Sequence, residues 1–310
     1  MMETLGTQSI SVALVLAIVL GPGWICVKLL YRRKKLERQR RRSPLTKDLL
    51  RTPGHTLREQ MEEGRSDLGA ELMVLMFLPA TVLAFLYVTS LVSGRATSIG
   101  VLAAMVAGVV AFSAYQTRKL LLRAKQLEQW GLGLDAEMAA GQELDQLMRQ
   151  GAVVFHDLAA DKFNIDHVVI SRRGVFAVET KGYRKPIRDG GSADATVLYD
   201  GKVLRFPDWA DSKPLAQAER QARWLADWLS RATGERIEVM PVLALPGWYV
   251  ERTGRGPVLV LNGVDLKDHL LKAHDAKPLS EEQMMRVAHQ VEQRCRDVRP
   301  FYRPVDEVTQ

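Results

Sequence analysis

The sequence predicts an α/β domain with a mixed β-sheet, preceded by three transmembrane α-helices. Two observations support this fold class. Three long runs near the N-terminus are almost free of charge, as segments that cross a bilayer must be. The remaining residues, about 185 of them, alternate between helix-like and strand-like periodicity in the order α-β-β-β-α-β-β-α. This order is typical of an α/β domain whose sheet is mixed.

The three apolar runs are residues 10–30, 72–92 and 98–115. Lys28 is the only charge in the first run and lies near its end, where a long side chain can reach the interface; the other two runs contain no charge. Pro79 would break a soluble helix, but prolines are tolerated in membrane spans. Buried core helices are the alternative, and the lengths of these runs favour spans.

Basic residues predict the orientation of the spans. Residues 1–9 carry only Glu3, which argues against a cleaved signal peptide, whereas the cluster YRRKKLERQRRR follows the first run and TRKLLLRAK follows the third. The positive-inside rule therefore predicts an outside N-terminus, a cytoplasmic linker over 31–71 and a cytoplasmic C-terminal domain. The basic residues of 31–42 would attract anionic lipid, and a solvated charged loop is the equal alternative.

The net charge of +7 does not by itself indicate nucleic-acid binding. Residues 31–70 hold 12 Lys and Arg against 6 Asp and Glu, whereas residues 126–310 hold 25 against 28. The basic excess thus lies beside the apolar runs, and the C-terminal domain is mildly acidic. The two cysteines, Cys26 and Cys295, do not support a disulfide framework or a cysteine-based zinc site. No phosphate-binding loop, dinucleotide fingerprint or Ser-His-Asp arrangement is recognisable.

The domain at 126–310 follows a membrane anchor at 1–125, and its elements are predicted from periodicity and capping. Helices are expected at 134–150, 214–233 and 280–298, the last starting at Ser280. Strands are expected at 152–158, 166–171, 175–180, 237–247 and 256–263. The stretch 186–213 is longer than a simple connection requires, so a hairpin flap or a substrate-contacting element is expected there.

The hairpin within FNIDHVVISRRGVFAVETKG, residues 163–182, places charges where a buried sheet ends. If the turn is centred on residues 172–173, residue numbers of partners sum to 345, and Asp166 lies opposite Glu179 with Cβ atoms about 5 Å apart. Lys181 lies on the same face. A divalent cation would relieve the repulsion between the two acids. Two alternatives remain: a polar end at which Lys181 neutralises one acid, and a one-residue slip that separates the acids.

These residues resemble the nuclease-related domain (NERD), a branch of the PD-(D/E)XK restriction-endonuclease-like superfamily. Asp166 opens one core strand and Glu179-Thr180-Lys181 ends the next, as in that pattern. The resemblance covers roughly residues 132–262 and implies a restriction-endonuclease-like mixed sheet flanked by helices.

The resemblance also implies the chemistry. Asp166, Glu179 and the Thr180 carbonyl would bind Mg²⁺ or Mn²⁺, and Lys181 would orient the attacking water or stabilise charge on phosphate. Glu137 matches the superfamily's N-terminal acid and would be a further ligand, directly or through water, with Asp135 as a competing acid. Gln217 matches the polar helix residue that many members place near the metal. The implied activity is phosphodiester hydrolysis, with nucleic acid, DNA in the first place, as substrate.

Several residues are weaker candidates. His156 and His167 flank the hairpin, and His167 falls on the face opposite Asp166, so a packed or hydrogen-bonded histidine is expected. Four tryptophans could stack on bases, although the helical spacing of two of them favours the core: Trp209, Trp224, Trp228 and Trp248. Four basic residues could touch phosphates or be solvated: Arg172, Arg173, Arg184 and Lys185.

The sequence therefore favours a membrane-anchored metal-dependent nuclease. The rival is a membrane-tethered scaffold that keeps the fold and binds nucleic acid or protein without cleaving it. The acidic balance of the domain is consistent with this rival, because duplex binding needs a basic surface. A protein whose spans are themselves the functional unit is a third class, and the absence of charge inside the spans does not support transport.

Overall fold

A computed structural model describes residues 23–33, 45, 47–93, 98–186, 195–272 and 276–300. The chain divides into two compact units. The helical unit consists of Met1–Lys47, Arg65–Lys125 and Arg299–Gln310, and the α/β unit consists of Asp48–Gly64 and Gln126–Val298. The sequence assigned residues 48–64 to a linker, whereas the structure includes them in the α/β unit.

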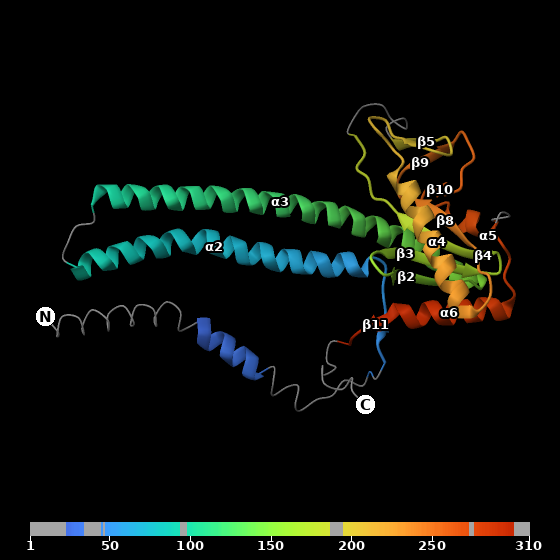
Figure 1. The fold of residues 1–310 in the computed structure, drawn as a ribbon, viewed down its shortest axis with the longest axis horizontal. Coiled ribbons are helices and arrows are strands. Elements are labelled where there is room, and N and C mark those ends of the chain that lie inside the picture. Colours follow the sequence, from blue (N-terminus) through green and yellow to red (C-terminus); the bar gives the residue numbers. More distant parts are fainter. Residues whose placement is uncertain are drawn as a thin grey trace. The chain divides into compact units, whose positions relative to one another are not determined.

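Two long helices, α2 (His55–Ser93) and α3 (Ile99–Asp145), contain the second and third expected spans (Figure 1). Each is long and apolar enough to cross a membrane, with mean hydropathies of 2.2 and 1.8 in the most apolar stretch, which is not buried by protein. Residues 23–33 are also helical, but most of the first expected span, 10–30, lies outside the described residues.

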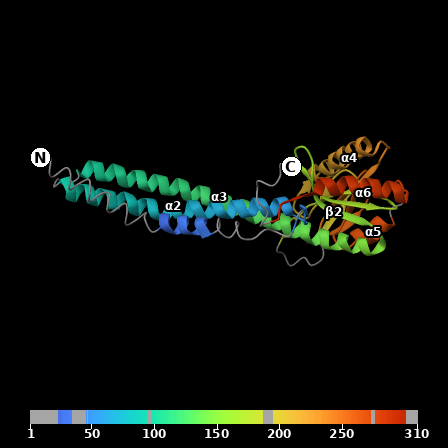
Figure 2. The same cartoon turned by 90° about the horizontal axis from the view of Figure 1, so that it is seen from below.

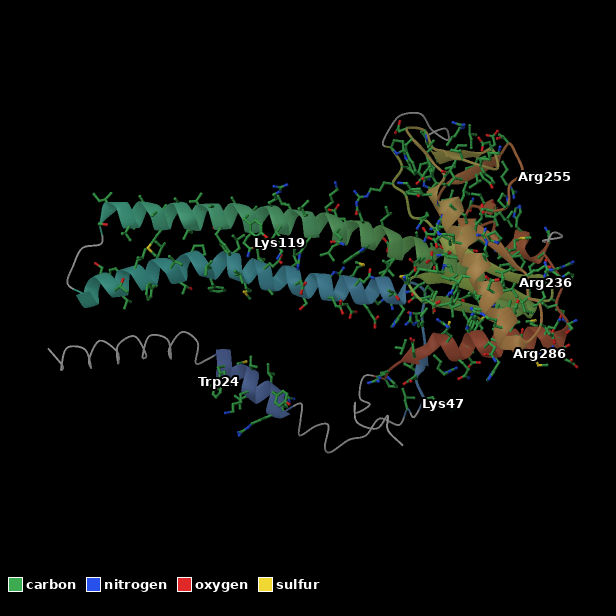
Figure 3. The ribbon with its side chains drawn as sticks, viewed as in Figure 1. Trp24, Lys47, Lys119, Arg236, Arg255 and Arg286 are labelled. Atoms are coloured by element: carbon green, nitrogen blue, oxygen red, sulfur yellow. The ribbon has the colours of Figure 1, made fainter. Side chains whose placement is uncertain are left out.

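Ion pairs between α2 and α3 mark the point at which both apolar runs end. Glu71 Oε1 contacts Lys119 Nζ at 2.7 Å and Arg123 Nη1 at 3.2 Å, and Arg123 also contacts Asp67 Oδ2 at 2.9 Å. Figure 3 shows Lys119 on α3, directed toward α2. The apolar side chains of the two helices therefore end at the same level, as two segments that leave a bilayer together would require.

The expected third span and the expected helix at 134–150 form one continuous helix. Helix α3 runs to Asp145 and is followed by a 3₁₀ turn at Gln146–Gln150, which ends at Gly151 with a φ of 82°. From Gln126 onward the helix belongs to the α/β unit, and its Ala140 and Leu144 are fully buried there.

The main sheet has five strands in the order β10-β8-β4-β3-β2. Its strands are β2 (Val153–Ala159), β3 (Asn164–Ser171), β4 (Gly174–Thr180), β8 (Val239–Ala244) and β10 (Leu259–Leu261). Strands β2, β3 and β4 are antiparallel, whereas β4, β8 and β10 are parallel. The predicted mixed sheet is thus confirmed.

The predicted register of the β3–β4 hairpin is also confirmed. His167 pairs with Val178 and Ile170 with Val175, so the numbers of the partners sum to 345. The slip that would separate the two acids does not occur.

Helices cover both faces of this sheet (Figure 2). Helices α4 (Lys213–Thr233) and α6 (Glu281–Cys295) pack on one face, where Val168, Ile170 and Ala177 lie. The end of α3 and α5 (Leu266–Leu271) pack on the other, against Val169, Phe176 and Val178. The expected start of α6 is confirmed, because Ser280 and Gln283 form a capping box.

The stretch after β4 contributes to a second, smaller sheet in the order β7-β6-β5-β9. Its strands are β5 (Thr196–Tyr199), β6 (Leu204–Arg205), β7 (Ala210–Asp211) and β9 (Tyr249–Arg252). Side chains of this sheet share a core with Leu243 in β8 and with Leu245, which directly follows β8. Separately, β1 (Leu49–Leu50) pairs with β11 (Arg296–Val298).

Candidate active site

Asp166, near the start of β3, and Glu179, near the end of β4, lie beside each other at one end of the hairpin. Side chains two residues apart in a strand lie on the same face of the sheet. Asp166 therefore shares a face with Val168, and Glu179 with Ala177, and this is the face that α4 covers. Asp166 Oδ2 accepts a hydrogen bond of 2.6 Å from the backbone N–H of Thr180. This bond joins the two strands beyond their last paired residues, His167 and Val178, and holds Asp166 beside the Glu179 segment.

Glu179 is 1% exposed and has a partner for each carboxylate oxygen. Oε1 contacts Lys181 Nζ at 2.6 Å, and Oε2 accepts a hydrogen bond of 2.5 Å from Gln221 Nε2 on α4. The same Gln221 nitrogen lies 3.0 Å from the carbonyl oxygen of Asn164 in β3. Gln221 therefore ties the helix to both strands that carry the acids.

The helix residue at the site is Gln221, not the predicted Gln217. Gln221 is buried, whereas Gln217 lies one turn earlier and is half-buried. The resemblance pointed to a glutamine on this helix, and the structure places a different glutamine, Gln221, against Glu179. The rotation of α4 about its own axis decides which of its residues face the sheet. This rotation is set by packing, which a sequence motif does not encode.

Glu137 is the acid that α3 brings to the cluster, and Asp135 is not. The side chain of Glu137 is buried, with 9% of the residue exposed, whereas Asp135 is exposed. Burial, followed by the carboxylates of Asp157 and Glu179, raises the pKa of Glu137 to about 8, although Lys181 acts in the opposite direction. Glu137 is thus close enough to Glu179 and Lys181 to feel both charges.

Ionisation of Asp166, Glu179 and Glu137 at the same time is unfavourable, because the acids repel one another and Lys181 offsets only part of their charge. Burial is the main cause that raises the pKa of Asp166 well above its usual range, and repulsion from Glu179 and Glu137 adds to it. Burial lowers the pKa of Lys181, but its contact with Glu179 more than offsets this, so the pKa is raised overall and the ammonium stays charged. The charges of all three carboxyl groups thus act on Lys181, which contacts Glu179 directly.

Gly182 allows the chain that leaves β4 to pack closely against α3. A Cβ atom at Gly182 would lie 2.6 Å from the carbonyl oxygen of Leu132 and 2.9 Å from the Cβ of Ala136, both on α3. Only glycine permits so close an approach of β4's exit to the helix that carries Glu137. The signal in the sequence is a glycine directly after Glu-Thr-Lys.

The donor chemistry of the cluster fits a hard divalent cation. Carboxylate oxygens of Asp166 and Glu179 and the Thr180 carbonyl at the strand end are ligands that Mg²⁺ and Mn²⁺ prefer, and Mg²⁺ commonly takes one or two carboxylates and completes its shell with water. In the part of the chain that the structure describes, no group of three or more His, Cys, Asp or Glu side chains is close enough to form a complete cage. A one- or two-carboxylate site is therefore the one that these residues suit.

A second polar cluster, which the sequence did not indicate, adjoins the acids. The buried Asp157 side chain accepts hydrogen bonds from Thr56 N (2.8 Å), Thr56 Oγ1 (2.6 Å), Asn164 Nδ2 (2.9 Å) and Arg51 Nη1 (3.4 Å). Asp157 has a φ of 51°, a conformation that non-glycine residues rarely adopt. Asn164 links this Asp157 cluster to the site, because its carbonyl oxygen accepts from Gln221.

The two histidines are confirmed as packed, hydrogen-bonded residues. His156 Nδ1 and His167 Nδ1 are 2.9 Å apart, and His156 Nε2 is 3.0 Å from Asp145 Oδ1. Burial, followed by the proximity of His156, lowers the pKa of His167 well below its usual range, so His167 is neutral at pH 7.

The four candidate phosphate-binding residues lie in two places. Arg172 pairs with Glu281 at 2.9 Å at the turn of the β3–β4 hairpin, which is the end away from Asp166 and Glu179. Arg184 follows the site by three residues and contacts Glu128 at 3.3 Å, and Lys185 Nζ lies 5.9 Å from the ring of Trp248.

Comparison with known families identifies one match. Residues 132–246 match the family model described as the nuclease-related domain, NERD. The matched segment contains the acids of α3, β3 and β4, Lys181 and Gln221, and ends just after β8. Comparisons with curated proteins and with solved structures gave no match.

Proposed function

We propose that this protein is a membrane-anchored nuclease that hydrolyses phosphodiester bonds of DNA with the help of Mg²⁺ or Mn²⁺. The observation that carries the proposal is the convergence of Asp166, Glu179 and Lys181 at one sheet end, inside a segment that matches a nuclease-related family model. The mixed sheet with helices on both faces supports the restriction-endonuclease-like architecture that this activity implies.

Each residue of the cluster has a role in this proposal. Asp166 and Glu179 would hold the metal with the Thr180 carbonyl, and Glu137 would be a further ligand, directly or through water. When bound, the metal supplies a Lewis acid and lowers the pKa of a coordinated water. Lys181 keeps its ammonium beside Glu179, from where it orients water or stabilises charge on phosphate. Gln221 fixes the Glu179 carboxylate and so sets the direction of its free lone pairs.

Nuclease assays with alanine variants test this proposal. The full chain, with plasmid or single-stranded DNA, should cleave with Mg²⁺ or Mn²⁺ and should be inactive with chelator. Asp166→Ala or Glu179→Ala should abolish Mn²⁺ binding and cleavage. Lys181→Ala should retain most Mn²⁺ binding but lose turnover, and Glu137→Ala and Gln221→Ala should show smaller losses. Gln217→Ala is the matched control on the same helix.

The opposite result supports the scaffold. If the wild-type protein neither binds Mn²⁺ in calorimetry nor cleaves any substrate, and the alanine variants unfold, the acids have a structural role and the protein binds without cutting.

The membrane part of the proposal is three spans with an outside N-terminus and a cytoplasmic α/β unit. Two helices with the length and hydropathy of spans support it, together with the basic clusters at 32–42 and 118–125. Reporter fusions at Gly94 and at Gln310 should report opposite compartments. Signals from the same compartment would contradict this topology. Contact of residues 31–42 with anionic lipid is part of the same proposal.

A further inference from the structure

Four aromatic side chains form a compact cluster next to the candidate active site. The rings of Phe206 and Trp209 are stacked, with centroids 3.8 Å apart and an interplanar angle of 11°. Tyr183 meets both edge-on, at 5.0 and 4.8 Å, and Trp248 meets Phe206 edge-on at 5.1 Å. Phe206 and Trp248 are buried, whereas Trp209 is 38% exposed. Trp209 is therefore the outward member, with one ring face packed on Phe206.

The cluster is held in place by the backbone around it. Trp209 lies in the short hairpin between β6 and β7, where the Phe206 N–H donates to the Trp209 carbonyl at 2.8 Å and Leu204 pairs with Asp211. Trp248 Nε1 donates to the Tyr183 carbonyl at 3.2 Å. A ring that is already fixed loses little conformational freedom when a flat ligand stacks on it.

The cluster adjoins the acids through the chain and through packing. Tyr183 follows Lys181 by two residues. Leu243 pairs with Glu179 on the neighbouring strand and belongs to the same buried core as Phe206 and Trp248. After burial, the charges of Asp211 and Glu179 are the causes that raise the pKa of Tyr183 to about 12, which places its hydroxyl in the field of the site.

We infer that Trp209 and the rings behind it stack on an unpaired base of the substrate, so that the preferred substrate is a single-stranded or frayed nucleic acid. The inference rests on the proposed nuclease function and specifies its substrate class. Every base has a flat π-face, and such stacking requires no particular sequence. Bases inside a duplex are stacked on each other and do not offer this face.

The charge of the domain supports the same substrate. Residues 126–310 hold 25 basic and 28 acidic residues, so they provide little general attraction for the dense charge of a duplex. A strand that binds by stacking needs fewer phosphate contacts. Lys185, near Trp248, is one cation placed to accompany a stacked strand.

Strand binding by the full chain in the presence of chelator tests the inference. Three labelled probes are compared by fluorescence anisotropy: a thymidine oligonucleotide, an abasic strand of equal length, and a duplex of equal length. Trp209→Ala should weaken binding of the thymidine strand by about 5- to 150-fold, because stacking on one aromatic ring contributes about 1–3 kcal/mol per base. It should change binding of the abasic strand and of the duplex by less than about twofold.

Three further variants separate stacking from folding. Trp209→Phe keeps a ring and should retain most of the affinity, whereas Trp209→Leu fills the apolar position without a ring and should lose as much as Trp209→Ala. Trp224→Phe is the control, because Trp224 on α4 also stacks on a neighbouring tryptophan, Trp228, but packs on the other core. It should bind like the wild type.

The result that overturns the inference is wild-type binding of the thymidine strand by Trp209→Leu, or an equal loss for thymidine and abasic strands. Because the assay contains no free metal, it is independent of cleavage. Trp209-dependent binding without cleavage would count against the nuclease alone, and cleavage that does not depend on Trp209 would count against the stacking site alone.

Discussion

Two buried carboxylate clusters lie side by side in the α/β unit and are stabilised in different ways. Asp157 is surrounded by donors from Thr56, Asn164 and Arg51, and Arg51 is held in turn by two hydrogen bonds to Asp297. In the acid cluster, Glu137 and Glu179 are buried and Asp166 is half-buried, and Lys181 contacts Glu179.

This is the difference expected between an acid that serves the fold and an acid that serves a binding site. A buried carboxylate that serves the fold receives its hydrogen bonds from the protein, since an unsatisfied buried charge is expensive. In the acid cluster, burial and then repulsion from neighbouring carboxylates raise the pKa values of Asp166 and Glu137, and a bound cation would relieve the repulsion. The contrast yields four predictions.

The largest effect is expected when residues 48–64 are removed. A fragment that begins at Gln126 lacks Thr56 and Arg51 and leaves Asp157 with Asn164 alone as a side-chain donor among the four bonds described. We expect its free energy of unfolding to be about 3–5 kcal/mol lower than that of a protein that keeps residues 48–64, since this is the usual cost when a buried charge loses its partner. Urea denaturation checks this value.

The matched control keeps residues 48–64 and replaces 65–125 with a short Gly-Ser loop. Gly64 and Leu127 are neighbours, since a Cβ at Gly64 would lie 2.9 Å from Leu127 Cδ2, so a short loop can join them. This joined protein should be soluble and more stable than the fragment from Gln126. Equal stability of the two proteins would show that the Asp157 cluster does not support the fold.

Amide substitutions at the two aspartates should have opposite effects. Asp157→Asn replaces an acceptor with an NH₂ group that faces donors, so we expect a loss of about 2–3 kcal/mol in the free energy of unfolding. Asp166→Asn removes one of three repelling acids, so without metal the protein should be equally stable or more stable. Urea denaturation with chelator measures both. Destabilisation by Asp166→Asn as large as that by Asp157→Asn would assign both clusters to the fold.

Glu137 and Asp166, whose pKa values are both raised, should both contribute to the pH dependence of stability, and the contribution of Glu137 can be measured separately. Its pKa is raised to about 8 in the folded state from 4.5, so between these pH values the folded protein binds more protons than the unfolded chain. Stability must then fall as pH rises from about 5 to about 8, by up to about 1.4 kcal/mol per pH unit for one proton. Glu137→Gln should remove much of this slope in metal-free unfolding experiments. An unchanged slope in the variant would mean that another group binds the proton.

The sequence predicted the parts of this architecture that depend on local patterns. Alternation of Val, Ile and Phe with the turn at Arg172 and Arg173 determined the register of the hairpin, and that register placed Asp166 opposite Glu179. The capping box at Ser280 was equally local. The expected spans rested on length and hydropathy, and two of the three coincide with helices long and apolar enough to cross a membrane.

The parts that failed depend on contacts between distant segments. Gln221 rather than Gln217 reaches Glu179 because of the rotation of α4 on the sheet, which packing determines. Asp157 is held by Thr56 and Arg51, about 100 residues earlier in the chain and beyond an apolar hairpin, and no periodicity reveals such a contact. The smaller sheet is built from strands of two to four residues, too short to produce a pattern.

The smallest expected effect concerns two pairs of basic residues that the sequence did not distinguish as phosphate contacts. Arg172 and Arg173 lie at the hairpin turn, and Arg172 is about 20 Å along the strand from Asp166 at 3.4 Å per residue. Arg184 and Lys185 directly follow Tyr183 and the acid cluster. The ion pairs of Arg172 and Arg184 are both exposed and therefore weak, so position decides which pair meets a strand bound at the site. Replacing Arg184 and Lys185 with Ala should reduce the slope of log K against log salt for a single strand by about 0.7 per lost phosphate contact. Replacing Arg172 and Arg173 should leave the slope unchanged, and a larger change there would place the strand along the hairpin turn instead.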